Sequence, residues 1–142
     1  MADHQLYLLD TDHISLLQRG NDNVRSRLLQ VDVLNRCVTV ISLAEQMQGW
    51  LAVIRRASSE TDATRGFQRL HETLTFYQSV TVLPYDQRAV EEFTRLRTLR
   101  VRIGTQDLRI AAIALSQNAV LVTRNHRDFQ QVASLTFVDW SA

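Results

Sequence analysis

The sequence contains no lysine, and all 16 of its basic residues are arginines. That absence excludes mechanisms that need a catalytic lysine, while arginine side chains can bind a phosphate group with two parallel hydrogen bonds. The single cysteine, Cys37, cannot form a disulfide within the chain, and no cluster of cysteine and histidine has the spacing of a zinc site. We therefore expect a protein of the reducing cytoplasm.

Long hydrophobic runs are missing as well, so we expect no membrane span. The N-terminal Met-Ala-Asp-His has an acidic residue and no cationic flank, which argues against a signal peptide. One proline, four glycines and no internal repeat leave few breaks in the 142 residues. That length is typical of one domain, and a content of 45% hydrophobic and 22% charged residues excludes a disordered chain.

Short apolar segments alternate with amphipathic helices along the chain. Strands are predicted at 6–9, 38–41, 80–83, 120–122 and 136–138. Helices are predicted from Ile14 to Gly20, over 21–34, 42–57 and 61–79, between Asp86 and Gly104, and from Thr105 to Asn118. This alternation predicts an α/β fold with helices on both faces of a parallel sheet, in which ligands bind at the carboxyl ends of the strands.

Acidic and amide side chains lie beside those strand ends. They are Asp10 and Asp12 after the first strand, Glu45 after the second, Asp107 at the start of the helix before the fourth, and Asn125 and Asp128 after the fourth. The helix over 106–118 rises roughly 18–20 Å, and the strand over 119–123 returns roughly 16 Å. Asp107 and Asn125 are therefore expected at the same edge of the sheet, together with Asp10 and Glu45.

Carboxylates that converge on one edge repel each other unless a cation is present. Oxygen ligands without histidine or cysteine favour Mg²⁺ or Mn²⁺. Such an ion can activate a water molecule and stabilise the charge that develops on a phosphate group. The sequence therefore predicts a phosphodiester hydrolase.

Each acidic residue also has a purely structural interpretation. Ser42-x-x-Glu45 has the pattern of a capping box, Asp107 can stabilise a helix dipole, and Asp12 can be an N-cap. Asp10 is harder to explain in this way, because a charge directly after four apolar strand residues is unfavourable without a specific role.

Four segments carry the motifs of a known family. They are Tyr7–Ser15, Ile41–Glu45, Gly104–Ala112 and Leu121–Phe129, and Val138–Trp140 matches the usual ending. In order and spacing they resemble PIN domains, in particular the VapC-type toxins of bacterial type II toxin–antitoxin pairs. The resemblance covers essentially the whole chain. It implies a single PIN domain over 1–142, built as a three-layer α/β/α sandwich around a parallel sheet of about five strands.

The resemblance also implies an activity and a partner. The expected activity is that of a Mg²⁺- or Mn²⁺-dependent endoribonuclease, which hydrolyses RNA and is inhibited by a small VapB-like antitoxin. The chain is expected to form a homodimer or a hetero-oligomer with that antitoxin. Asp10, Glu45 and Asp107 would bind the metal, and the hydroxyls of Thr11 and Thr123 would support the site.

The fourth motif departs from the family pattern, because Asn125 stands where many PIN domains have aspartate. Asp128, one turn further on, is a candidate for the missing charge, although it can also be a solvated turn residue. The motif is then equally consistent with two arrangements. Two metal sites can be formed before RNA binds, or one metal can be bound tightly while a second arrives with the RNA. Asp12 stands where the family often has asparagine, which gives it a supporting role.

Two arginines beside the fourth motif, Arg124 and Arg127, are candidates for contact with RNA phosphates. Arg102 is another, although its arginine-rich stretch can equally be a solvated helix face. His13 and His126 lie near the predicted site, but a mechanism based on carboxylates and a metal does not need them.

Four aromatic residues lie on predicted helices that family members use for dimer or antitoxin contacts. For most of them core packing is the simpler interpretation. They are Trp50, Phe67, Phe76 and Tyr77.

Two other functions stay open. A PIN fold could bind RNA or protein without turnover, which only Asn125 favours. Alternatively, Asp10-Thr11-Asp12 imitates the nucleophile motif of aspartyl-phosphate phosphatases of the haloacid dehalogenase type. Those enzymes normally use a lysine and a cap domain, and this chain has neither the lysine nor the length for a cap.

Overall fold

The computed structural model describes residues 4–142, so most of the N-terminal segment used to argue against a signal peptide lies outside the described residues. The centre of the fold is a parallel sheet of five strands in the order β3-β2-β1-β4-β5. The strands are β1 (Tyr7–Leu9), β2 (Arg36–Thr39), β3 (Thr81–Leu83), β4 (Val120–Val122) and β5 (Phe137–Val138). The predicted number and direction of strands are confirmed.

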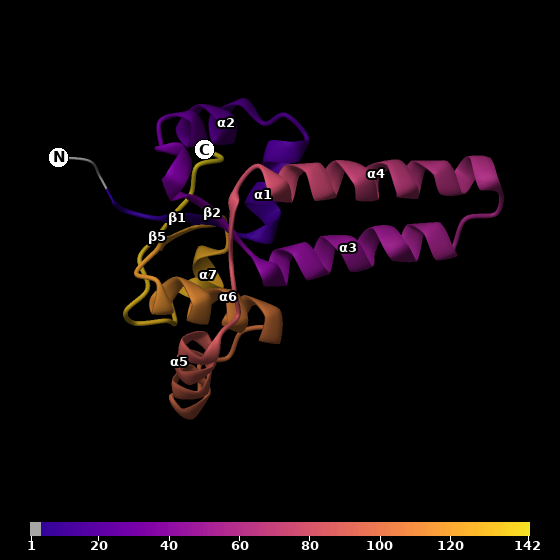
Figure 1. Cartoon of the computed structure of the whole chain (residues 1–142). Coiled ribbons are helices and arrows are strands. Elements are labelled where there is room, and N and C mark those ends of the chain that lie inside the picture. Colours follow the sequence, from indigo (N-terminus) through magenta and orange to yellow (C-terminus); the bar gives the residue numbers. More distant parts are fainter. Residues whose placement is uncertain (1–3) are drawn as a thin grey trace.

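Helices cover both faces of this sheet, as Figure 1 shows. They are α1 (Thr11–Gln18), α2 (Asp22–Leu29), α3 (Val40–Arg55), α4 (Glu60–Gln78), α5 (Gln87–Thr98), α6 (Thr105–Ser116) and α7 (His126–Phe129). Helices α3 and α4 run side by side and project from the sheet as an arm, while α5 and α6 lie below the sheet in that view. The three-layer α/β/α sandwich is confirmed.

The two faces of the sheet bury separate hydrophobic clusters, because neighbouring residues of a strand point to opposite faces. Leu8 and Leu121 pack with α5, α6 and α7. Leu9 and Val122 pack with α1, α2, the end of α4 and the C-terminal Trp140. Strands buried on both faces explain why the sequence shows continuous apolar runs rather than an alternating pattern.

The start of α3 corrects two predictions. The predicted second strand, 38–41, ends earlier, because the Thr39 hydroxyl accepts a hydrogen bond from the Ser42 amide at 3.1 Å and begins the helix at Val40. The capping-box interpretation of Ser42 and Glu45 is therefore wrong, and Glu45 lies in the second turn of α3. Asp12 is likewise no N-cap.

The predicted helix over 21–34 is also divided. Helix α2 ends at Leu29, and the side chain of Asp32 then accepts a hydrogen bond from the Leu34 amide, which caps a separate 3-10 turn at Val33–Asn35. Asn118 ends α6 as expected, with a positive φ of 53° directly after the C-cap residue.

The arm of α3 and α4 is closely packed at Gly66. A Cβ atom at this position would lie 2.6 Å from Cγ1 of Ile54, so α4 can approach α3 here only because residue 66 has no side chain. Further along the arm, toward the sheet, the two helices and β3 enclose an apolar groove. Within residues 4–142, no helix is both long enough and apolar enough to cross a bilayer.

Candidate active site

Asp10 joins β1 to α1 at the carboxyl edge of the sheet. Its carboxylate caps α1 by accepting a hydrogen bond from the His13 amide at 3.1 Å, and the residue is only 5% exposed. Burial raises the pKa of Asp10 to about 6; hydrogen bonds with His13 and Thr123 oppose this shift, while the neighbouring Asp12 adds to it. Asp10 is thus a buried carboxylate that resists ionisation when no cation is present.

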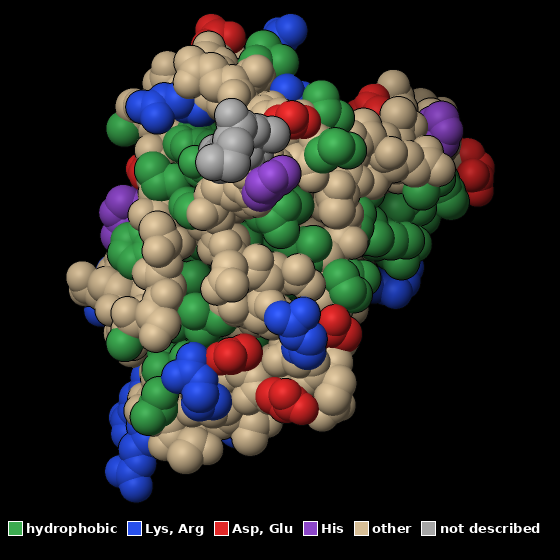
Figure 2. All heavy atoms as spheres, turned by 60° about the vertical axis from the view of Figure 1, so that its left-hand side comes forward, with side chains coloured by type: hydrophobic (Ala, Val, Ile, Leu, Met, Phe, Trp, Pro, Cys, Tyr) green, Lys and Arg blue, Asp and Glu red, His purple; other side chains and the backbone are tan. Residues whose placement is uncertain are grey.

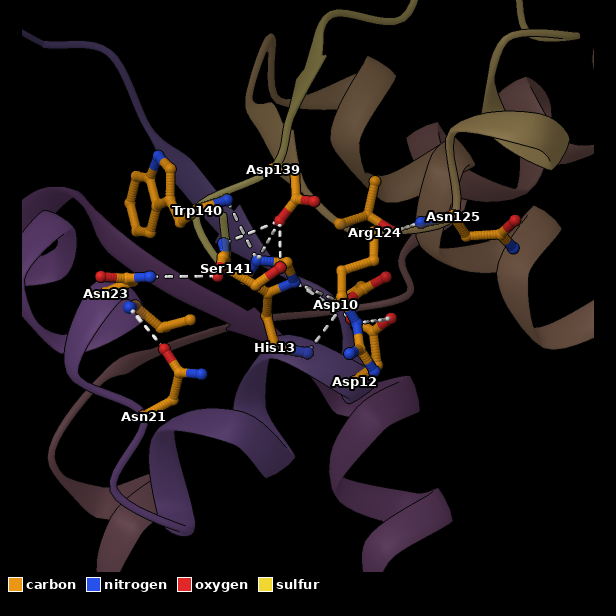
Figure 3. A network of polar contacts seen from close by, with 12 residues as sticks. Asp10, Asp12, His13, Asn21, Asn23, Arg124, Asn125, Asp139, Trp140 and Ser141 are labelled. Atoms are coloured by element: carbon orange, nitrogen blue, oxygen red, sulfur yellow. Dashed lines mark hydrogen bonds and ion pairs between the residues drawn. The ribbon is translucent and has the colours of Figure 1, made fainter.

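Asp12 and His13 complete the cluster at the start of α1, shown in Figure 3. The Nδ1 atom of His13 lies 3.0 Å from Oδ1 of Asp12 and 3.7 Å from Oδ1 of Asp10. Although burial acts in the opposite direction, the hydrogen bonds with His13 and Asp10 lower the pKa of Asp12. Burial would lower the pKa of His13, but its contacts with Asp10 and Asp12 outweigh that effect and raise the pKa to about 9.

Glu45 reaches the site from α3 through the hydroxyl of Thr11. That hydroxyl donates to Oε1 of Glu45 at 3.2 Å and lies 2.8 Å from the hydroxyl of Ser42. Burial raises the pKa of Glu45, the Thr11 hydrogen bond lowers it, and the charge of Asp107 raises it further. Thr11 therefore holds Glu45 beside the first motif.

Asp107 comes from the first turn of α6, as predicted. Its pKa is raised by burial and by the charges of Asp128 and Asp12. The carboxylates around Asp10 are therefore linked by electrostatic repulsion. These carboxylates are Asp12, Glu45, Asp107 and Asp128. The carboxylates that sequence analysis expected at one edge are close enough to influence each other.

The fourth motif is organised around Asn125, which caps α7. Its side-chain oxygen accepts from the Asp128 amide at 3.3 Å, and its Nδ2 atom donates to Oδ2 of Asp128 at 3.0 Å. The buried Thr123 hydroxyl accepts from the Asn125 amide at 3.0 Å and also hydrogen-bonds to Asp10. In Figure 3 the Asn125 side chain points away from Asp10, so Asn125 orients Asp128 rather than facing the centre of the cluster.

The three candidate RNA-binding arginines have different surroundings. Arg124 is half-exposed, and its Nε atom lies 3.6 Å from Oδ2 of Asp12. Arg127 is exposed on α7. Arg102 is exposed in the loop before α6, and its backbone is hydrogen-bonded to the side chain of Gln131.

The preceding helix α5 carries arginines that are already engaged. Arg95 pairs with Glu92 at 2.8 Å, and Arg97 lies 5.6 Å above the ring of Phe93. Arginine and acidic side chains are also interspersed at the lower end of Figure 2, where α5 lies. This part of the stretch is therefore a mixed solvated face.

The donor set of the cluster fits a divalent cation. Within residues 4–142, one group of three candidate ligands has all its ligand atoms within 4.8 Å of one another, namely Asp10, Asp12 and His13. Glu45, Asp107 and Asp128 lie around it. Carboxylate oxygens predominate, as in Mg²⁺ and Mn²⁺ sites, and the pKa values of Asp10, Glu45 and Asp107 are raised by burial and, to a lesser extent, by neighbouring carboxylates.

The contacts behind this cluster were not predicted from the sequence, which placed His13 near the site without giving it a necessary role. His13 is completely buried, and its second ring nitrogen contacts the C-terminal residues Asp139 and Trp140. Ser42 is buried beside Thr11. The available signals were weak: a histidine one residue after an acidic pair, and an aspartate and a tryptophan directly after the last strand.

Comparison with known proteins agrees with this geometry. The model of the PIN domain family matches residues 7–135. The chain is 29% identical over 141 residues to Ribonuclease VapC1 of Haemophilus influenzae, an alignment that covers 96% of this chain and 98% of that protein. Ribonuclease VapC2 of the same species is 27% identical over 139 residues, covering 94% and 97%.

Two solved structures extend the similarity to three dimensions. The structure of VapBC-1 from nontypeable Haemophilus influenzae matches with a TM-score of 0.78 and 27% identity, covering 97% of this chain and all of that one. DNA-bound VapBC from Salmonella typhimurium matches with a TM-score of 0.77 and 25% identity, covering 96% and 98%. With the family model, the sheet order and the acidic edge in agreement, the chain belongs to the PIN-domain family.

Proposed function

We propose that this chain is an endoribonuclease dependent on Mg²⁺ or Mn²⁺, and that it is the toxin of a VapBC-type toxin–antitoxin pair. The observation that carries the proposal is the acidic edge, where Asp10 is buried with a raised pKa and further carboxylates surround it. Such an arrangement is unfavourable for the isolated chain and becomes favourable when a divalent cation binds. The curated relatives are named ribonucleases, which supports RNA as the substrate.

The roles of the residues follow from their positions. Asp10, Glu45 and Asp107 would hold the cation, with Asp128 as a further oxygen ligand that Asn125 orients. When bound, a divalent cation lowers the pKa of a coordinated water and neutralises charge on a phosphate group. Thr11 keeps Glu45 in place, and Thr123 donates to Asp10.

Substrate binding would rely on arginines at the rim of this edge. Arg124 and Arg127 are placed to contact phosphates, and Arg102 to extend the same surface along the RNA backbone. Arg124 pairs with Asp12 in the isolated chain, so it can exchange that carboxylate for an RNA phosphate without leaving the site. Phosphate contacts of this kind make RNA binding dependent on salt.

The test is cleavage of RNA by the purified chain free of antitoxin. Cleavage is expected with Mg²⁺ or Mn²⁺, and it should stop when EDTA is added or when Asp10 is replaced by asparagine. RNA that is bound but stays intact with every divalent ion tried would instead identify a binding module without turnover.

The arm of α3 and α4 offers a surface for the antitoxin. Its apolar groove has a volume of about 560 Å³ and is lined by residues of α3, α4 and β3, among them Met47, Phe67, Leu74 and Tyr77. Phe67 is 56% exposed and Leu74 53%, so core packing does not explain them, whereas Tyr77 is buried. Figure 2 shows hydrophobic side chains gathered toward the arm. VapBC complexes among the structural neighbours support an antitoxin segment with an apolar face as the occupant.

One residue links the groove to the acidic site through charge. Tyr77 lines the groove, and its pKa is raised by burial and by the charge of Glu45. An antitoxin seated in the groove would thus lie close enough to the carboxylates to block access of RNA. The antitoxin complex proposed here does not depend on whether the chain also forms a homodimer.

A charge placed in the groove tests the docking surface. Leu74→Glu should weaken binding of a VapB-like antitoxin at least tenfold, measured by calorimetry. Leu29→Glu is the matched control, since Leu29 is 61% exposed on α2, away from the arm. Equal affinity of the two variants would place the antitoxin elsewhere.

A further inference from the structure

The C-terminal segment Asp139–Ser141 is connected to the acidic site through His13, although it lies beyond the residues matched by the family model. We propose that this segment is part of the active-site support, and that His13 is the positioning residue through which it fixes the carboxylates of Asp10 and Asp12 for a divalent cation. The inference rests on the proposed metal-dependent function and adds a positioning element to it.

The ring of His13 is held from both sides. Its Nε2 atom accepts a hydrogen bond from the Trp140 amide at 3.2 Å and lies 3.4 Å from Oδ1 of Asp139. In the neutral ring Nε2 accepts and the proton is on Nδ1, whereas in the protonated ring both nitrogens carry a proton and Nε2 faces the carboxylate of Asp139. In either state Nδ1 donates to Oδ1 of Asp12 at 3.0 Å. The backbone amide of His13 donates to Asp10. One residue thereby orients both carboxylates.

The C-terminal segment is itself fixed to the fold. The amide and the hydroxyl of Ser141 both donate to Oδ1 of Asp139, at 2.7 and 2.6 Å, and Nδ2 of Asn23 donates to the carbonyl of Ser141 at 3.2 Å. The side chain of Trp140 is 4% exposed and packs 5.5 Å from the ring of Tyr7. Figure 3 shows these residues in a continuous chain of contacts that leads to His13.

These contacts indicate that His13 orients the carboxylates of Asp10 and Asp12, in addition to filling space in the core. Asp10 and Asp12 are like charges two residues apart, and His13 contacts both of them, with its backbone amide on Asp10 and its ring on Asp12. Because the His13 ring is completely buried and bonded at both nitrogens, it cannot rotate without losing a partner. Partners of this kind behind a metal ligand typically contribute about 10- to 100-fold in metal affinity.

The test compares two replacements of His13 in the purified full chain. The amide of asparagine occupies the place of Nδ1 and can still donate to Asp12, whereas the amide of glutamine occupies the place of Nε2 and reaches only Trp140. Titration with Mn²⁺ by calorimetry should show that His13→Gln, which loses the donor to Asp12, weakens binding about 10- to 100-fold. His13→Asn keeps that donor and loses only the contact with the C-terminal segment, so it should weaken binding about three- to tenfold, as Asp139→Ala does. Thermal unfolding in EDTA reports the effect of each variant on folding alone.

A second pair of variants tests the segment itself and remains available if the glutamine variant does not fold. Asp139→Ala removes the acceptor of Ser141 and should weaken Mn²⁺ binding about three- to tenfold. Asp22→Ala, which removes an exposed acid from the first turn of α2, is the matched control and should leave Mn²⁺ affinity unchanged.

The outcomes separate this inference from the proposed function. Mn²⁺ affinity within threefold of the original chain for both His13→Gln and Asp139→Ala overturns the positioning role, whatever happens to RNA. Tight Mn²⁺ binding by the original chain without RNA cleavage overturns the proposed function and leaves the His13 result in place. An original chain that binds no Mn²⁺ contradicts both.

Discussion

The two halves of the acidic edge are built in different ways. Asp10 and Asp12 follow one strand, and hydrogen bonds to His13 and Thr123 hold them from behind. Glu45 and Asp107 come from two different helices and are half-buried; the charge of Asp107 raises the pKa of Glu45, and the charges of Asp128 and Asp12 raise that of Asp107. Hydrogen bonds thus fix the positions of Asp10 and Asp12, the first half, whereas the helices hold Glu45 and Asp107, the second half, near other carboxylates that repel them.

This difference indicates where the energy of cation binding arises. The first half has its geometry before any ion arrives, so little ordering is needed there. The second half also gains, because a divalent charge offsets the burial and the like charges that raise the pKa values of Glu45 and Asp107. A site of this design combines a rigid anchor with ligands that are stabilised only when the ion binds.

The strongest way to break the first half is Asp10→Asn. Cleavage should fall by at least about 100-fold, more than for the loss of a partner behind a ligand. The fold should become more stable, because asparagine can still cap α1 and the pKa of Asp10 is about 6 rather than the usual 3.8. Ionised Asp10 disfavours the folded state, so the gain should be on the order of 2 kcal/mol above pH 6 and vanish below about pH 4.

Denaturation in EDTA at these two pH values measures that gain. Asp86→Asn is the matched control, because Asp86 also caps a helix with its carboxylate but lies at the start of α5. Equal stability of Asp10→Asn and the original chain at neutral pH would contradict the idea that Asp10 is an unfavourable buried charge.

The second half is tested by Glu45→Gln and Asp107→Asn. Each should weaken Mn²⁺ binding at least about tenfold. In EDTA each should stabilise the fold by a few tenths of a kcal/mol, a small effect because both carboxylates are partly screened by solvent. The double variant should gain less than the sum of the two, since either change alone removes their mutual repulsion. Exact additivity in urea denaturation would show that the two carboxylates do not interact.

Asn125→Asp sharpens the comparison by adding charge to the fourth motif. Asn125 donates to Asp128, so an aspartate there would replace a hydrogen bond with repulsion. The midpoint of thermal unfolding in EDTA should fall by a few degrees, which corresponds to about 1 kcal/mol. Saturating Mn²⁺ should restore it, and Mn²⁺ affinity should rise several-fold. A variant that is no less stable in EDTA would contradict the assigned role of Asn125.

The smallest expected effect is on RNA binding at the rim. Arg124→Ala should weaken RNA binding severalfold and reduce the slope of its salt dependence by about 1. Arg97→Ala, which lies over Phe93 on α5, should leave the slope unchanged. Fluorescence anisotropy at several salt concentrations distinguishes the two, and identical slopes would remove Arg124 from the binding surface.

The positions and parallel direction of the strands and most of the helices could be predicted from the sequence, because buried parallel strands leave clear apolar runs. The start of α3 could not. Thr39, Val40 and Ile41 are all β-branched and favour a strand, and only the hydrogen bond from the Ser42 amide to Thr39 decides where the helix begins.

The acids of the candidate site were found because strand ends of a parallel sheet meet at one edge. His13 was placed near the site, but its contact with Asp139 was not predicted, because the two residues are 126 apart in the sequence and no local pattern indicates such a contact. The asparagine in the fourth motif was noticed, but its hydrogen bonds to Asp128 depend on the turn into α7, which the sequence does not specify.

Gly66 sets the separation of α3 and α4 at a single point, well away from the acidic edge. A larger residue there would spread the arm and reshape the groove while leaving every carboxylate where it is. Recognition of the inhibitor and the capacity to cut RNA can therefore diverge through separate mutations.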